Sequence, residues 1–188
     1  MLFMLTFLGS LGFGWYSKKF GFASMWITLF NLLFSLYIGI MITPTIVGFL
    51  PAFAEVYYKI LCCFFVVFFV FVIARYVTTL YFEHALDAIM PDVFSTIAAG
   101  VAGFFIMMII TNFIIFSGYA VATNVVKDSE TLSGPAFDKS ASIVMSSCNI
   151  IHKLAGQPLY DMPTKVIEWY KIQPTDVKTE EEVTPDEV

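Results

Sequence analysis

The chain has 188 residues, of which 59% are hydrophobic and only 13% are charged, about half of the roughly 25% that is usual in soluble domains. Its net charge of −5 arises after residue 120, and an acidic chain without clustered Lys and Arg argues against a nucleic-acid partner. No hydrolase, metalloprotease or nucleotide-binding motif occurs in the sequence, so we expect no enzyme, no catalytic residue, no cofactor and no metal site.

Long uncharged runs predict an all-α membrane protein. Residues 20–54 and 93–126 contain no Asp, Glu, Lys, Arg or His. A helix crosses about 30 Å of hydrocarbon with about 20 apolar residues, and a charge in mid-membrane costs roughly 2.5–3.5 kcal/mol. We expect a polytopic helical bundle of about four transmembrane helices over residues 1–121, an extramembrane helical segment over 122–172 and an acidic disordered tail over 173–188.

The first predicted helix, over residues 1–16, is short for a bilayer, and it ends in an interfacial Trp–Tyr pair. The second runs from Phe22 to Ile42, and Pro44 ends it because the residue before a proline is disfavoured in helical conformation. The loop over 44–54, which contains two prolines, either lies in the interface or re-enters the membrane.

A third helix is predicted over residues 56–81 and a fourth over 92–121. Asp92 stands at the start of the fourth helix, where a negative charge suits the positive end of the helix dipole. In the polar C-terminal region, residues 137–154 have the spacing of a short amphipathic helix, with Phe137, Ile143, Val144, Ile150, Ile151 and Leu154 on its apolar face. A second short helix is expected over 162–170.

Basic residues predict the orientation. Lys18 and Lys19 lie in the short turn between the first two helices, and Arg75 lies near the end of the third helix on the same side. Because cytoplasmic loops carry an excess of Lys and Arg, this side should face the cytoplasm and both termini should be extracytoplasmic.

Polar side chains within the predicted spans need partners. Asn31 and Ser35 are one turn apart and share a helix face, and Asn112 lies in the fourth helix. These side chains could form interhelical hydrogen bonds, which are worth about 0.6 kcal/mol on average. The alternative is that they line a polar pathway. Arg75 is expected to extend its charge to the headgroups, with a role in gating or partner contact as the alternative.

Small residues recur in the fourth helix at intervals of four. Ser95, Ala99 and Gly103 fall on one face, with Gly100 beside them. Small residues let two helices approach closely and gain dispersion contacts. Tight packing within the bundle is the expected role of this face, and self-association through it is the alternative.

Two stretches resemble the colicin V production protein (CvpA-like) family of bacterial inner-membrane proteins. The first is GFGWYSKKFGFASMWITLFNLLFSLYIGIMITP, residues 12–44, in which Lys18, Lys19 and Gly21 stand at the basic turn that precedes the family's long second helix. The second is ALDAIMPDVFSTIAAGVAGFF, residues 85–105. In this stretch Asp92, Gly100 and Gly103 stand where the family has an Asp and a glycine-rich helix start.

The chain departs from the family pattern in three ways: Val93 stands in place of an Arg, Thr96 stands in place of a Gly, and the acidic residue common near the family's N-terminus is missing. The resemblance covers residues 9–120. It implies an inner-membrane location and a role in toxin production or export, or in envelope homeostasis.

Two functions follow as hypotheses. In the first, the chain is a non-enzymatic accessory protein of the bacterial inner membrane that associates with a protein partner or with further copies of itself. In the second, it is a small oligomeric transporter or channel, with Asn31, Ser35 and Asn112 lining a polar path.

Overall fold

The computed structural model describes residues 2–49, 56–82, 92–125 and 135–156. This part of the chain is helical and contains no strand, as the sequence predicts. Its helices are α1 (Leu2–Ser17), α2 (Phe22–Phe49), α3 (Val56–Phe82), α4 (Asp92–Val125) and α5 (Pro135–Leu154).

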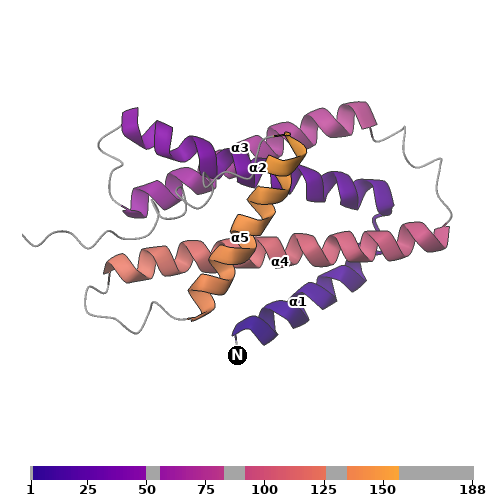
Figure 1. Cartoon of the computed structure of the whole chain (residues 1–188). Helices are drawn as coiled ribbons and strands as arrows, with labels where there is room; N and C mark the ends of the chain where they lie inside the picture. Colours follow the sequence, from indigo (N-terminus) through magenta and orange to yellow (C-terminus); the bar gives the residue numbers. More distant parts are fainter. Residues whose placement is uncertain (1, 50–55, 83–91, 126–134, 157–188) are drawn as a thin grey trace, which may run out of the picture.

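Helices α1 to α4 pack with alternating direction (Figure 1). The first turns of α2 and α4 meet, since the backbone N–H of Phe22 donates to Ser95 Oγ at 3.1 Å. Helix α3 runs antiparallel to α2, and α1 runs antiparallel to α4. The start of α2, the start of α4 and the end of α3 therefore lie at one end of the bundle, which we call the basic end because Lys18, Lys19 and Arg75 belong to it.

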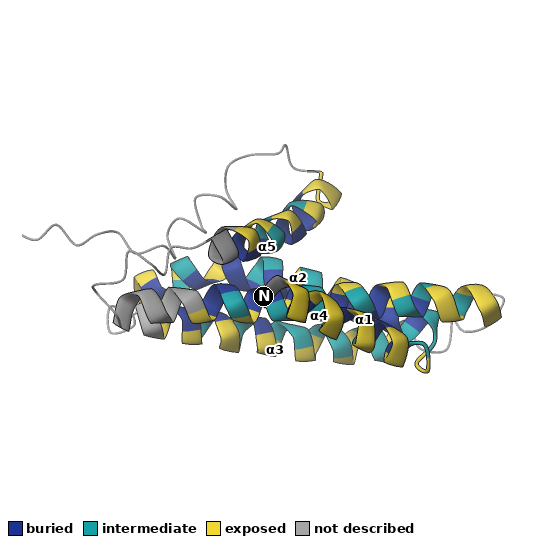
Figure 2. Ribbon diagram, turned by 90° about the horizontal axis from the view of Figure 1, so that it is seen from below, coloured by how far each residue is buried: buried dark blue, intermediate teal, exposed yellow. Residues whose placement is uncertain are grey.

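Helix α5 does not follow this alignment. It crosses α2 and α4 obliquely (Figure 1) and lies on the opposite side of them from α3 (Figure 2). The bundle is thus a layer of roughly aligned helices with one short amphipathic helix laid across it.

Within the described ranges, three helices are long and apolar enough to cross a membrane: Phe22–Phe49, Tyr58–Tyr81 and Asp92–Gly118. Helix α1, with 16 residues, is not among them, so the expected count of four spans is not confirmed. Large apolar side chains cover the outer side of α3, among them Phe65, Phe68, Phe69, Ile73, Tyr76 and Leu80. So much contiguous apolar surface is rare on soluble monomers and suits contact with lipid.

The predicted end of α2 before Pro44 was wrong, because α2 continues to Phe49 with Pro44 inside it. Pro44 has no N–H to donate to the carbonyl of Ile40, but in a bilayer, leaving the helix there would expose several backbone groups without water to bond them. The hydroxyl of Thr43 donates to the carbonyl of Gly39 at 2.6 Å, one turn before the proline. The predicted loop over 44–54 is therefore helical up to Phe49, and 50–55 lies outside the described residues.

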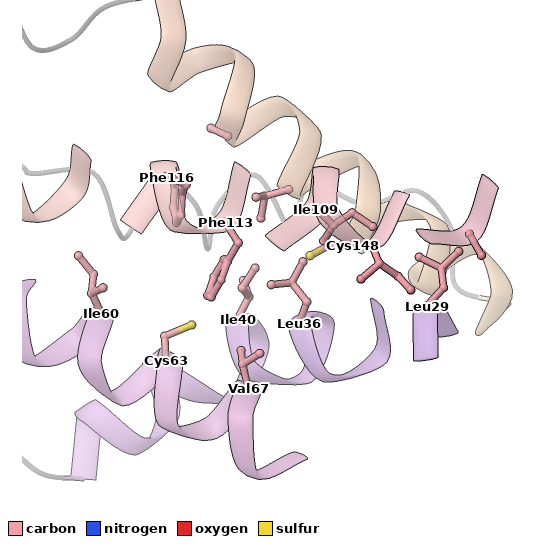
Figure 3. Packing of buried hydrophobic residues seen from close by; sticks show 14 of the residues in the cluster. Leu29, Leu36, Ile40, Ile60, Cys63, Val67, Ile109, Phe113, Phe116 and Cys148 are labelled. Atoms are coloured by element: carbon pink, nitrogen blue, oxygen red, sulfur yellow. The ribbon is translucent and has the colours of Figure 1, made fainter. Parts of the chain in front are cut away.

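The hydrophobic core is centred on α2. Leu36 and Ile40 are each 1% exposed, and they lie between residues of α3 on one side and residues of α4 and α5 on the other (Figure 3). Gly39 faces α3 so closely that a Cβ at this position would collide with a methyl group of Val67. Helices α2 and α3 can therefore approach each other at a point where any larger residue would separate them.

Helices α1 and α4 pack through small residues. A Cβ built on Gly14 would lie 2.9 Å from the carbonyl oxygen of Gly100, and a Cβ built on Gly103 would collide with the side chain of Ser17. The hydroxyl of Ser17 lies 2.9 Å from the carbonyl oxygen of Ala99, to which it donates across the interface. The small-residue face of α4 is thus used within the bundle, with α1 as its partner.

Replacing Gly14 by Ala should destabilise the protein by about 1–3 kcal/mol, because the added methyl group meets backbone atoms that cannot move aside. Gly12→Ala is the matched control, since no atom lies within 4 Å of a Cβ there and Ala favours the helix. The free energy of unfolding measured in mixed micelles by titration with dodecyl sulfate tests this. Equal changes in the two variants would contradict the close approach of α1 and α4.

Candidate functional site within the helix bundle

Polar side chains form a stripe along one face of α2. The stripe consists of four residues at intervals of three or four: Ser24, Thr28, Asn31 and Ser35. Asn31 and Ser35 are only 2% and 0% exposed. Hydroxyl groups on this face bond to their own helix: Thr28 donates to the carbonyl of Ser24 at 2.6 Å, and Ser35 donates to that of Leu32 at 2.9 Å. The stripe faces the interior of the bundle, as expected for Asn31 and Ser35.

Asn31 of this stripe donates a hydrogen bond to α3. Its Nδ2 donates to Thr78 Oγ1 at 2.7 Å, and Thr78 in turn donates to the carbonyl of Ala74 at 2.8 Å. The amide of Asn112 instead donates to the carbonyl of Met108, in its own helix, at 2.7 Å. Asn112 is 3% exposed, so the two amides expected to line a path have separate partners and little exposed surface.

Arg75 extends from α3 towards the first turns of α2. Its Nη1 donates to Thr28 Oγ1 at 3.1 Å and its Nη2 donates to Ser24 Oγ at 3.3 Å. Because Ser24 lies at the very start of α2, the guanidinium is directed to the basic end of the bundle. This is the direction expected for a charge that reaches for the headgroups, but the structure adds two hydroxyl partners that the sequence analysis did not identify.

The turn between α1 and α2 holds the two adjacent lysines. Gly21 has a φ of +79°, a conformation that is easy for glycine alone, and it turns the chain into α2. Lys18 Nζ lies 3.9 Å from the ring centroid of Trp15, and Lys19 Nζ lies 5.4 Å from that of Tyr16. Both cations are thus held over aromatic rings by cation–π attraction, next to the basic end.

The start of α4 is at Asp92, as predicted. Asp92 is exposed, and its carbonyl accepts a hydrogen bond from Thr96 Oγ1 at 2.8 Å. Ser95 lies on the small-residue face, but its hydroxyl also accepts the N–H of Phe22. It therefore satisfies one of the free amide groups at the start of α2.

Helix α5 is amphipathic, as predicted, but its buried face is rotated from the predicted one. Ile150 and Leu154 are 52% and 70% exposed, and the side chain of Phe137 lies outside the described set. Of the predicted face, α5 buries Val144 and Ile151, and it adds smaller or more polar residues: Ser140, Ala141, Ser147, Cys148 and His152. Small residues let α5 sit close to α2 and α4, whereas a face of Ile150 and Leu154 would hold it away.

A hydrogen bond joins α5 to the middle of α2. Tyr37 Oη and His152 Nδ1 lie 3.0 Å apart, and the hydroxyl donates when Nδ1 carries no proton. No feature of a single helix marks this pair, because Tyr37 and His152 are separated by most of the chain. The sequence analysis did not identify either residue.

Cys148 is the most deeply buried side chain with a reactive group in α5, at 2% exposed. Burial raises the pKa of its thiol to about 12, and the Cys63 thiol adds to the rise. The thiolate is the reactive form of cysteine, so Cys148 is inert while α5 is docked. Its labelling therefore reports whether α5 has left α2 and α4.

Among the residues that the structure describes, no group of three or more His, Cys, Asp or Glu side chains could hold a metal ion. The predicted helix over 162–170 and the acidic tail over 173–188 lie outside the described residues. No protein-family model matches the chain, no curated protein matches it and no solved structure matches it.

A double-mutant cycle on Asn31→Ala and Thr78→Val should give a coupling energy of about 0.6 kcal/mol, with an upper bound near 1.7 kcal/mol, as for other interhelical hydrogen bonds in membranes. The free energy of unfolding in mixed micelles is the quantity to measure. Asn112→Ala combined with Thr78→Val is the control cycle, and it should be additive because Asn112 bonds within its own helix. A coupling energy of zero between Asn31 and Thr78 would contradict the hydrogen bond between them.

Proposed function

We propose that this chain is a non-enzymatic, multi-pass protein of the bacterial inner membrane that acts by associating with a protein partner or with further copies of itself. Like the CvpA-like proteins that its sequence resembles, it would support toxin production or export, or envelope homeostasis. The support for association comes from the outer side of α5.

The outer side of α5 carries polar residues beside the exposed Ile150 and Leu154, although the helix lies against apolar spans. The exposed polar residues along this side are Ser142, Ser146 and Lys153. The Tyr37–His152 contact places the last turns of α5 at the level of the middle of α2. If α2 crosses the bilayer, Lys153 and its neighbours face hydrocarbon, where a lysine costs roughly 2.5–3.5 kcal/mol.

A protein partner resolves this conflict by supplying hydrogen bonds and a negative charge at that level. Lipid tails offer neither, and polar groups in membrane helices are commonly satisfied by other helices. The alternative, a polar path through the bundle, has less support, because Asn31, Ser35 and Asn112 are at most 3% exposed and are bonded within the protein.

A photoreactive amino acid at Ser146 should form a crosslink to protein in intact cells, because this position faces the proposed partner. The same residue at Phe69, which is 59% exposed on the outer side of α3, is the control and should label lipid. The mass of the adduct distinguishes a second copy from another protein. Lys153→Glu should lower the yield at Ser146 several-fold, since it reverses the charge that the partner would meet.

Retained protection of Cys148 from maleimide shows in each variant that α5 is still docked. With α5 docked, lipid adducts alone at Ser146 would contradict association through this face.

The proposed orientation predicts a matched pair of labelling results. A cysteine added after Val188 should react with a membrane-impermeant maleimide in intact cells, whereas Lys19→Cys should react only after the membrane is permeabilised. The unaltered chain measures the background from its own three cysteines. The reverse pattern would place the basic turn outside and the termini in the cytoplasm.

A further inference from the structure

The guanidinium of Arg75 is only partly satisfied by the protein. An arginine side chain has five N–H donors, and in Arg75 two of them are directed at Thr28 and Ser24. Within the part of the chain that the structure describes, no carboxylate lies in ion-pair distance of this group. The positive charge is therefore balanced by something other than the described residues.

The hydroxyl groups beside Arg75 are arranged to accept one more ligand. Thr28 directs its proton to the carbonyl of Ser24, so it serves Arg75 as an acceptor. Ser24 accepts from Arg75, and in the described residues its own proton has no acceptor. Arg75 and Ser24 thus offer several N–H donors and one O–H donor where α3 meets the first turns of α2.

The surroundings of this group are those of a bilayer surface. Lys18 and Lys19 lie in the turn that precedes α2, and with Arg75 they face a single described acid, Asp92, at the basic end. Trp15 and Tyr76 are 75% and 72% exposed, as aromatic side chains at the membrane–water interface are. A cation at this depth meets headgroups rather than hydrocarbon.

We propose that Arg75, with Ser24 and Thr28, forms a binding site for a phosphate group, namely the phosphodiester of an anionic lipid headgroup. The planar guanidinium donates two parallel hydrogen bonds to two phosphate oxygens, a geometry that a lysine ammonium does not reproduce. Ser24 Oγ donates a third, and Thr28 holds the guanidinium in place. Lys18 and Lys19 favour a headgroup with net negative charge over a zwitterionic one, whose ammonium group they would repel.

This inference depends on the chain lying in a bilayer and not on the partner proposed for α5, so the two can fail separately. The test uses the whole purified protein in nanodiscs of phosphatidylcholine alone and of phosphatidylcholine mixed with phosphatidylglycerol. Bound lipid is counted by native mass spectrometry, and the thermal midpoint is measured in both discs.

The wild-type protein should retain phosphatidylglycerol over phosphatidylcholine, and Arg75→Gln should reduce this preference about tenfold, as expected for the loss of charge-assisted hydrogen bonds. Arg75→Lys keeps the charge and should still lose most of the preference. Ser24→Ala keeps Arg75 and should lose a smaller part, which guards against a general folding defect. Lys153→Gln, which removes one charge from α5, is the control and should leave the preference unchanged.

Inorganic phosphate added to the protein in detergent separates the two sources of the same group. If phosphate raises the thermal midpoint of the wild type as much as phosphatidylglycerol does, and does not do so for Arg75→Gln, the site takes free phosphate and the lipid assignment is overturned. If Arg75→Gln lowers the midpoint equally in both kinds of nanodisc, a group of the protein itself balances Arg75. That result would overturn the site as a whole.

Discussion

Polar groups removed from water must find their hydrogen bonds inside the protein, and this chain meets that demand mostly within single helices. Hydroxyl groups of Ser10, Thr28, Thr43, Thr111 and Ser147 donate to the carbonyl one turn earlier, at 2.6–2.9 Å. A hydroxyl bonded in this way needs nothing from a neighbouring helix. It packs like a small apolar group, so the polar stripe of α2 can face the interior without opening a path through it.

The contacts between helices are of different kinds, and each follows from the residues that meet. Helices α1 and α4 touch through glycine and serine, where a single methyl group would force them apart. Helices α2 and α3 combine one such close approach, at Gly39, with the hydrogen bonds of Asn31 and Arg75. Helix α5 is held by small buried residues and by Tyr37 and His152.

Two polar features lie on the outside of the bundle, and we propose a different partner for each of them. The last turns of α5 lie at the level of the middle of α2, and for this side we propose a protein partner. Arg75 lies at the basic end, where a headgroup phosphate is within reach. The two proposals differ because the two features lie at different positions along the spans: the outer side of α5 lies at the level of the middle of α2, and Arg75 lies near one end of the bundle.

Hydropathy and the positions of proline, glycine and charged residues were enough to predict the all-α class and the ranges of α1, α3 and α5 to within two residues. They also predicted the start of α4 at Asp92 and the inward face of Asn31 and Ser35. Helix α2 continues through Pro44, and in a bilayer the local preference of one residue is weaker than the cost of exposing backbone groups to hydrocarbon. The partners of Asn31, Arg75 and Tyr37, the use of the small-residue face by α1, and the rotation of α5 were decided by tertiary packing. Each of these depends on which helices lie side by side, and periodicity within one helix carries no information about its neighbours.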